Sequence, residues 1–439
     1  MIWRWKGGIH PWDGKSISKD KHIKEYKPTS DGVYPLIQHI GAPAVPIVKK
    51  GDAVLVGQKI AEAGGFVSAP IYSAISGTVK AIEPRMTASG SRVESIVIEN
   101  DGKFTEAEPI PVQPWEQLSR EEIIALIQDA GVVGMGGATF PTHVKLSPKE
   151  PEKIDYVIVN GAECEPYLTS DYRRMLEEPE HLIEGLKIML SLFSNAKGII
   201  SIEKNKPDAI KLLEELTKQE DNIEVKALPT KYPQGAERHM VYASTGRYMN
   251  ADYLPADVGC IVDNVDTVRA IYDAVVCRKP LISRVVTVTG DGIVNPQNYQ
   301  VPIGTSTREL IEEAGGFVGT PEKVISGGPM MGIALFDLDV PICKGSSAVL
   351  MFQKDQVSAA KPSNCINCGR CVSICPSRLL PGKLAHYAAH GDKQSFTGHY
   401  GMDCCECGSC TFICPAKRHL AQTIKSMRRD ILAERKKKA

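Results

Sequence analysis

The chain has 439 residues, and its 52 basic and 52 acidic side chains give a net formal charge of zero. This balance argues against nucleic-acid binding, and a zinc-bearing nucleic-acid module is the least favoured class of function. Hydrophobic residues make up 43% of the chain, which is typical of a soluble globular protein, and no apolar run approaches the roughly 20 residues that span a bilayer. The length predicts about three or four domains.

The N-terminal region, residues 1–112, consists of short β-type runs separated by glycine and proline. Residues 46–60 predict two strands joined by a Lys-Gly-Asp turn. The same strand–turn–strand pattern occurs a second time and ends at residues 75–82. The pattern resembles the barrel-sandwich hybrid of biotinyl and lipoyl carriers. Because the expected hairpin holds no Met-Lys or Asp-Lys modification dipeptide, we expect an unmodified docking or structural module.

Residues 113–283 alternate helix and strand. Ser119 and Glu122 form a capping box before a helix that stops ahead of Gly131, and its predicted apolar face carries Ile123, Ile124 and Ile127. Strands are expected at 156–160 and 198–202, a long helix over about 172–194, and further helices after Pro207 and Gly235. This alternation predicts a parallel sheet with helices on both faces and a ligand at the carboxyl ends of its strands.

Two segments of this region predict a ligand site. The glycine-rich residues 134–145 let backbone amides approach a phosphate, with Lys145 as countercharge, although such loops are common and weak evidence alone. Residues 160–166 place an amide and two carboxylates at a strand end, where ribityl, ribose or flavin-edge groups would suit them. The alternative is that Glu163 and Glu165 only cap the helix near residue 172.

Residues 284–345 are β-rich again. They predict a strand at 285–289 and a short helix capped by Ser306 with Glu309 at its third position, which together resemble a β-grasp unit of the SLBB type. Residues 423–439 form a basic tail, which we expect to be a solvated frayed helix; contact with anionic lipid is the alternative.

Residues 346–422 hold two cysteine runs of identical spacing, each followed by proline. In two-cluster ferredoxins, three cysteines of one run and the last cysteine of the other bind one [4Fe–4S] cluster. The spacing therefore predicts a helical ferredoxin-like domain with two clusters, whose ligands are Cys365, Cys368, Cys371 and Cys414 for one and Cys404, Cys407, Cys410 and Cys375 for the other. Cys405 is left over.

Zinc sites and disulfides are the alternatives for these runs. Zinc needs only four ligands and has no use for four cysteines in each run, nor for the prolines that follow them. Disulfides are less favoured, since small residues interleave the thiols and other cysteines lie scattered along the chain. We expect a reducing compartment.

The motifs carry a family resemblance. Residues 134–145, 160–166 and 262–267 are similar to the flavin-site segments of the NADH-oxidising 51-kDa subunit of respiratory complex I. Residues 7–11, 38–43 and 254–259, with the two cysteine runs in the same order, resemble the family of C subunits of Rnf ion-translocating electron-transport complexes. The resemblance implies a multidomain α/β protein with a Rossmann-like domain for non-covalent FMN and NADH.

By motif match, the resemblance implies FMN contacts from Gly134, Gly136, Gly137, Lys145, Asn160, Glu163 and Asn264. Phe140 would stack on an NADH ring, and Glu165 and Glu237 would read nucleotide hydroxyls. Two positions depart from the complex I pattern, because Met135 replaces an arginine and Ala162 an acidic residue. We expect Cys164 to be an inert buried thiol.

The parts together predict electron transfer between NAD(H), FMN and two clusters, because a flavin exchanges electrons in pairs or singly whereas a cluster takes one. The resemblance implies a peripheral subunit on the cytoplasmic side of the cell membrane. Its partners would be other Rnf subunits, among them a ferredoxin-like cluster subunit and membrane subunits, and indirectly ferredoxin. The alternatives are a soluble protein that feeds a cytoplasmic reductase and a cluster-bearing carrier without nucleotide activity. The A subunit of the sodium-pumping quinone reductase shares the outline but lacks the cluster cysteines.

Overall fold

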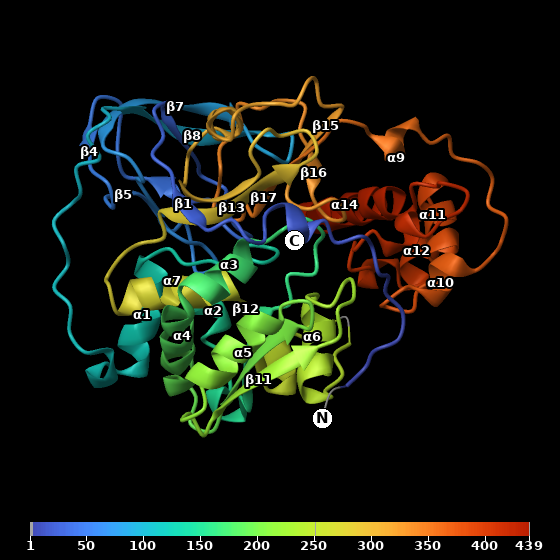
Figure 1. The fold of residues 1–439 in the computed structure, drawn as a ribbon, viewed down its shortest axis with the longest axis horizontal. Coiled ribbons are helices and arrows are strands. Elements are labelled where there is room, and N and C mark those ends of the chain that lie inside the picture. Colours follow the sequence, from blue (N-terminus) through green and yellow to red (C-terminus); the bar gives the residue numbers. More distant parts are fainter. Residues whose placement is uncertain (1–2, 251, 439) are drawn as a thin grey trace.

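Four structural units make up the chain in this computed structural model, which describes residues 3–250 and 252–438. Figure 1 shows an N-terminal β unit mostly in blue, an α/β unit from teal through green to yellow, a second β unit mostly in yellow to orange and a helical unit in orange to red. This is the predicted multidomain α/β architecture, and the fold class is confirmed.

The N-terminal unit packs two antiparallel sheets against each other. Their interior is filled by buried residues such as Val54, Ile60, Ile96 and Ile98. One sheet has the order β2 (Gly32–Pro35), β8 (Arg92–Asn100), β7 (Gly77–Met86), β4 (Ala53–Val54), and the other β3 (Val45–Pro46), β5 (Lys59–Glu62), β6 (Ile71–Tyr72). The arrangement is the expected barrel-sandwich hybrid.

The α/β unit is built on a parallel sheet. Its strand order is β11 (Ile223–Leu228), β10 (Lys197–Glu203), β9 (Tyr156–Gly161), β12 (Cys260–Asn264). The chain leaves β9 toward β10 and returns on its other side as β12, so the strand order reverses at β9. Asn160 and Asn264 are paired at the ends of β9 and β12, and ligands of open α/β sheets bind at such a switch point.

Helices cover both faces of this sheet: α1 (Arg120–Asp129), α2 (Thr142–Lys145), α3 (Ser170–Glu177), α4 (Pro179–Ser191), α5 (Pro207–Leu216), α6 (Glu237–Thr245) and α7 (Val265–Val275). Val157 and Val159 point to the core beneath α4 and α7, whereas Ile158 points to the core beneath α6, as the alternation of a strand requires. The capping box of Ser119 and Glu122 is confirmed.

The predicted long helix over 172–194 is wrong, because two helices occupy this span. Glu178 separates α3 from α4 and has φ −135 and ψ 48. Pro179 follows it, and a proline disfavours helical geometry at the residue before it while starting a new helix readily.

The second β unit is a mixed sheet with the order β1 (Ile23–Glu25), β14 (Gln297–Pro302), β13 (Ser283–Gly290), β17 (Ala348–Phe352), β15 (Lys323–Ser326), β16 (Ile333–Ala334), and it carries helix α8 (Thr307–Glu313). The predicted boundary at 345 cuts this sheet, since β17 pairs with β13 and β15. Strand β1 also belongs here rather than to the N-terminal unit.

Ser306 is the N-cap residue of α8 and Glu309 is its third residue, as predicted, but the expected capping bond is absent. Glu309 is drawn away from this role because its carboxylate accepts hydrogen bonds from the backbone and hydroxyl groups of Thr29 and Ser30.

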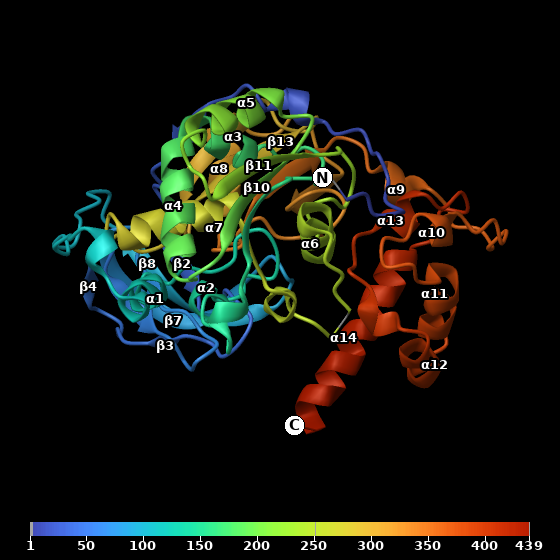
Figure 2. The same cartoon turned by 90° about the horizontal axis from the view of Figure 1, so that it is seen from below.

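The helical unit contains α9 (Gln356–Ala359), α10 (Arg370–Ser373), α11 (Pro381–Ala389), α12 (Lys393–Gly398), α13 (Ser409–Phe412) and α14 (Leu420–Lys438). The expected separate tail from residue 423 is wrong for its first part, because Ile424, Met427 and Ile431 of α14 are buried in the core of this unit. The far end of α14 projects away from the rest of the molecule (Figure 2). Among the described residues, none of the helices is long and apolar enough to span a membrane.

Candidate functional site

A single cleft of about 2160 Å³ lies at the switch point of the parallel sheet. All ten residues predicted to hold FMN or NADH line it: Gly134, Gly136, Gly137, Phe140, Lys145, Asn160, Glu163, Glu165, Glu237 and Asn264. A typical small-molecule pocket has roughly 300–1,000 Å³, so this cleft has room for a flavin beside a dinucleotide. Residues of the second β unit and of the helical unit complete its walls.

The glycine-rich loop lies over the N-terminus of α7. The amide of Gly134 donates to the carbonyl of Phe140 at 2.8 Å, which closes the loop, and the amide of Met135 donates to Thr267 Oγ1 at 2.8 Å. A Cβ on Gly136 would come within 2.9 Å of the Asn264 Cβ, while Gly137 faces open space. The loop therefore needs glycine at 136 to lie this close to the helix.

Lys145 is bound to carboxylates rather than free. Its Nζ donates to Val262 O at 2.6 Å and to Asp263 Oδ1 at 3.0 Å, and Glu237 Oε1 lies 3.9 Å away. Burial acts to lower the pKa of Lys145, but the charges of Asp263 and Glu237 outweigh burial and raise it. The lysine stays charged, with part of its charge already balanced by protein.

Glu163 caps helix α3 through one carboxylate oxygen, and its contact with FMN stays a prediction. Its Oε1 accepts from the Asp171 amide in the first turn of α3 at 2.8 Å, and Lys15 Nζ lies 3.6 Å from its Oε2. Burial, together with the charges of Glu163 and Asp266, raises the pKa of Asp171 to about 7. Asn264 donates to Asp171 at 2.7 Å. The acidic groups of this wall are thus held in place before any ligand arrives.

Glu165 supports a loop of the second β unit. Its Oε1 accepts from the Tyr232 hydroxyl at 3.2 Å and its Oε2 from the Met330 amide at 3.2 Å. A Cβ on Gly328 would lie 2.2 Å from Oε2. Burial raises the pKa of Glu165 to about 7. Its two oxygens are engaged by protein, and a contact with nucleotide hydroxyls stays a prediction.

Arg284 also lines the cleft, although no sequence pattern pointed to it. This arginine is 2% exposed. Its Nη2 donates to Met135 O at 3.3 Å, and Nη1 lies 3.3 Å from Asp266 Oδ2 without forming a hydrogen bond. It comes from β13 of another unit, so no local pattern could link it to the loop.

The residues of the cleft fit a flavin nucleotide. Arg284 Nη1, Glu163 Oε2 and Asp263 Oδ2 are buried polar atoms without hydrogen-bond partners in the protein, and such atoms are uncommon unless a ligand or water satisfies them. Donors and acceptors beside a glycine cradle suit a ligand with both phosphate and hydroxyl groups.

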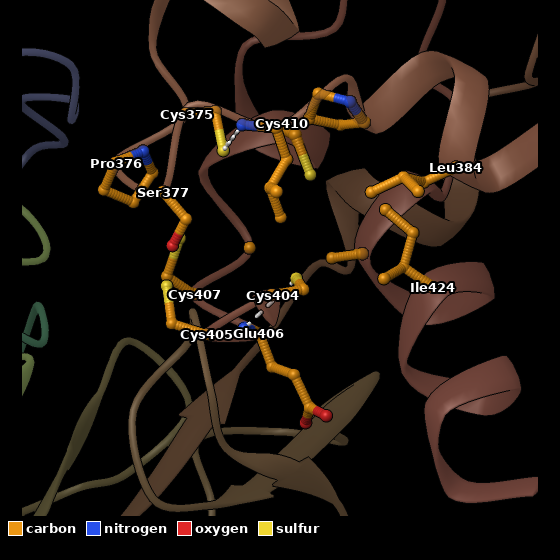
Figure 3. Close-up of a pocket in the computed structure, with 14 residues that line it drawn as sticks. Cys375, Pro376, Ser377, Leu384, Cys404, Cys405, Glu406, Cys407, Cys410 and Ile424 are labelled. Atoms are coloured by element: carbon orange, nitrogen blue, oxygen red, sulfur yellow. Dashed lines mark hydrogen bonds between the residues drawn. The ribbon is translucent and has the colours of Figure 1, made fainter. Parts of the chain in front are cut away.

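Four of the predicted cluster ligands surround one pocket (Figure 3). They are Cys404, Cys407 and Cys410 of the second run and Cys375 of the first, and we call them the inner set. Burial and the charges of the other three raise the pKa of Cys410 to about 12, so the four sulfurs act on one another. This grouping of one run with the last cysteine of the other is the interlaced pattern that the spacing predicts.

The other four cysteines, Cys365, Cys368, Cys371 and Cys414, form the outer set. Cys365 and Cys368 are exposed, whereas Cys371 and Cys414 pack against the core of the helical unit. Helices α10 and α13, which carry Cys371 and Cys410, pack together. No three metal-binding side chains in residues 3–250 and 252–438 are close enough together to hold a single ion.

Residues 7–9, which we call the strap, lie between the cleft and the inner set. The Gly8 amide donates to Ile374 O at 2.7 Å, and Ile9 exchanges two backbone hydrogen bonds with Tyr232. Ile9 and Tyr232 are buried together with Cys407. Cys164 borders this layer, where burial raises its thiol pKa, in keeping with an inert role.

Comparison with known families defines the class of protein. Residues 3–103 match the RnfC barrel sandwich hybrid domain, 127–273 the Nuo51 FMN-binding domain, 285–334 the SLBB domain and 364–419 a 4Fe-4S dicluster domain. The chain is a multidomain flavoprotein that carries FMN and two [4Fe–4S] clusters.

Two relatives place it more narrowly. It is 46% identical to the C subunit of the Na⁺-translocating ferredoxin:NAD⁺ oxidoreductase complex of Acetobacterium woodii over 98% of each chain. It is 47% identical to the C subunit of the proton-translocating complex of Clostridium ljungdahlii over 88% of this chain and 84% of that one. The chain belongs to the family of C subunits of ion-translocating oxidoreductase complexes.

A solved structure shares the fold at low identity. A chain of an NAD⁺-reducing [NiFe]-hydrogenase in the air-oxidized state aligns with a TM-score of 0.51 and 18% identity, covering 74% of this chain and 69% of that one. At this identity, the likeness concerns the fold alone.

Proposed function

We propose that this protein is the NAD(H)-reacting subunit of an ion-translocating ferredoxin:NAD⁺ oxidoreductase complex, in which it passes electrons between NAD(H), FMN and two [4Fe–4S] clusters. One observation carries the proposal. Cys405 and Cys407 line the same cleft as the ten predicted nucleotide residues, so a flavin bound there would be next to the inner cluster.

Bound FMN would exchange a hydride with the nicotinamide and exchange electrons one at a time with the cluster. The chain positions this chemistry. Gly136 lets the loop lie against Asn264, and Gly137 faces open space. The half-buried Phe140 lines the cleft, where an NADH ring would stack on it. Asn160 and Asn264 stand at the ends of neighbouring strands, where they would help to hold the flavin nucleotide.

The surroundings of the two cysteine sets predict the order in which electrons pass through the clusters. The inner set adjoins the flavin cleft and includes the buried Cys407 and Cys410, whereas the outer set presents two exposed cysteines to solvent. Electrons leaving the flavin would therefore reach the inner cluster first and the outer cluster second. The outer cluster would exchange them with a partner.

The partners follow from the family. We infer that the protein is peripheral, on the cytoplasmic side of the membrane, and that it assembles with membrane subunits and with a ferredoxin-like cluster subunit. Ferredoxin would be linked to it indirectly.

Anaerobic reconstitution tests this function. The protein should bind about eight irons and FMN, and NADH should bleach the flavin. A matched pair of variants locates the flavin: Gly136→Ala should weaken FMN binding through collision with Asn264, whereas Gly398→Ala, at a site with open space, should not. Binding is followed by quenching of flavin fluorescence. Zinc in place of iron, or equal FMN binding by both variants, would contradict the proposal.

A further inference from the structure

Charge is strongly segregated along this neutral chain. Residues 360–439 carry 14 basic and 5 acidic side chains, whereas the first 359 residues carry 38 basic and 47 acidic. The helical unit that holds the clusters is therefore basic, and the remainder of the molecule is acidic. A field of one sign on one unit acts on the approach of charged partners rather than on the fold.

Some of this positive charge is balanced within the unit. Lys393 pairs with Glu434, and Lys425 and Arg428 both pair with Glu406. Around the outer cysteines it is not balanced. Among the described residues no ion pair is formed by Lys361, Arg370, Lys417 or Arg418.

These basic residues are neighbours of the outer set in the sequence or through a backbone contact. Residues 361–370, which contain Cys365 and Cys368, are all exposed. The Ser363 amide donates to Ala416 O at 2.9 Å, so this segment lies beside Lys417 and Arg418. Arg370 directly precedes Cys371. Because all four cysteines of the set would bind one cluster, the residues between and beside them must lie within a short distance of it.

Exposed apolar side chains lie among these charges. Ile366, between two of the outer cysteines, is 66% exposed, and Phe412 on α13 is 51% exposed. The segment from α9 to α10 runs along the outer edge of the molecule, away from the parallel sheet (Figure 1). Apolar side chains within a charged rim are the usual anatomy of a transient protein interface.

We propose that this outer basic face, formed by Lys361, Ile366, Arg370, Phe412, Lys417 and Arg418, docks an acidic one-electron carrier protein. The inference rests on the proposed function, since it takes the outer cluster as the point where electrons enter or leave. One electron passes from the reduced centre of the carrier to the outer cluster, and no bond or proton is exchanged. A lipid surface would match the charge but would supply no redox centre.

The test uses the full-length reconstituted protein. A reduced acidic ferredoxin is the probe, and it stands in for the ferredoxin-like cluster subunit, because ferredoxin itself is linked to this protein only indirectly in the proposed complex. Stopped-flow absorbance gives the second-order rate constant of cluster reduction at several salt concentrations. In the double variant Arg370→Glu/Lys417→Glu, we expect this rate constant to fall about tenfold at low ionic strength and to lose its salt dependence. Lys204→Glu is the matched control, because Lys204 is exposed on the acidic α/β unit.

A second electron donor distinguishes loss of docking from damage to the cluster. Reduced methyl viologen is a small cation, so the double variant should accept its electrons faster than the unchanged protein. Slower transfer from both donors at full iron content would overturn the proposal, and so would an unchanged ferredoxin rate. Loss of binding to phosphatidylcholine–phosphatidylglycerol vesicles with an unchanged ferredoxin rate would assign the face to lipid instead. Failure of NADH to bleach the flavin would refute the nucleotide step of the proposed function. The docking result is read separately, because reduction of the cluster by ferredoxin is measured without NADH.

Discussion

The two cysteine sets have the same spacing and different surroundings. The inner set lies under the N-terminal strap and beside the flavin cleft, with Cys407 and Cys410 buried. The outer set has two exposed cysteines on a segment whose ten residues are all exposed. Equal spacing predicts the two sets alike, whereas packing against other units gives each set different surroundings.

The largest expected effect comes from removing one ligand of each set. Cys407→Ala should lower the iron content from about eight to about four and block the route from flavin to outer cluster, so that NADH bleaches the flavin alone. Cys368→Ala should lose the same amount of iron yet leave the inner cluster reducible by NADH. Iron analysis and anaerobic absorbance spectra measure both. Identical spectra for the two variants would contradict the distinction between an inner and an outer cluster.

The next largest effect is expected from a substitution in the strap, and it should concern only the inner cluster. Gly7 has φ 91, and a Cβ there would lie 2.9 Å from Ile374 O and 3.0 Å from Cys375 O. Gly7→Ala should lower the free energy of unfolding by about 2 kcal/mol and slow electron transfer from flavin to inner cluster. Denaturant titration and stopped-flow absorbance measure these changes.

Gly391→Ala is the matched control for the strap. Gly391 belongs to the helical unit that the strap contacts and has φ 69, but a Cβ there meets nothing within 4 Å. This variant carries the backbone strain without the collision, so it should keep the native electron-transfer rate. A rate as slow as that of Gly7→Ala would show that strain alone explains the effect.

The two cysteine runs have an equivalent position at which a charge can be removed from one and introduced in the other. Glu406 precedes Cys407 as Asn367 precedes Cys368, and both have positive φ, 56 and 54. Glu406→Gln removes a negative charge beside the inner cluster and should raise its reduction potential, while Asn367→Glu should lower that of the outer cluster. We expect shifts on the order of tens of millivolts. A redox titration followed by electron paramagnetic resonance that showed both clusters moving together would contradict independent surroundings.

The smallest effect concerns pH and is confined to the flavin side. The folded pKa values of Glu165 and Asp171 are about 7, above the ordinary values of 4.5 and 3.8. The folded protein thus holds protons that the unfolded chain has lost, so the stability linked to these groups is present at low pH and is lost as the pH rises through about 7. Glu165→Gln should flatten this decline by on the order of 1–3 kcal/mol in denaturant titrations.

Asp392→Asn serves as the counterpart on the cluster side. Hydrogen bonds from Ser395 lower the pKa of Asp392, so its contribution is present above the unfolded pKa and is lost on acidification. This variant should leave the decline between pH 5 and pH 8 unchanged. A flattening equal to that of Glu165→Gln would place the pH dependence elsewhere.

Local patterns were enough to predict much of the fold. The spacing of the cysteines predicted the inner set that surrounds one pocket, and the capping box of Ser119 and Glu122 predicted the start of α1. The parallel sheet followed from alternating helix and strand. These features depend on residues close together in sequence, which is why one chain suffices to find them.

Contacts between residues far apart in the sequence were not predicted. Arg284 reaches the glycine-rich loop from β13, and Glu165 receives the Met330 amide across the chain. Glu309 is taken from its helix cap by Thr29 and Ser30. In each case the partner lies in another unit and has no periodicity or motif that points to it.

The pairing of β1 with β14 has a consequence for synthesis. The N-terminal segment finds its partners very late, as when Asn298 Nδ2 donates to the carbonyl of Ser18, 280 positions earlier. On the ribosome, the barrel-sandwich unit is complete long before β14 has been made, and domains generally fold as units in the order of their emergence. The N-terminal segment can bond to Tyr232 of the α/β unit earlier, but its pairing with β14 and its bond to Ile374 must wait until the second β unit and the first cysteine run have emerged. The N-terminal segment thus completes its contacts late, although it is synthesised first.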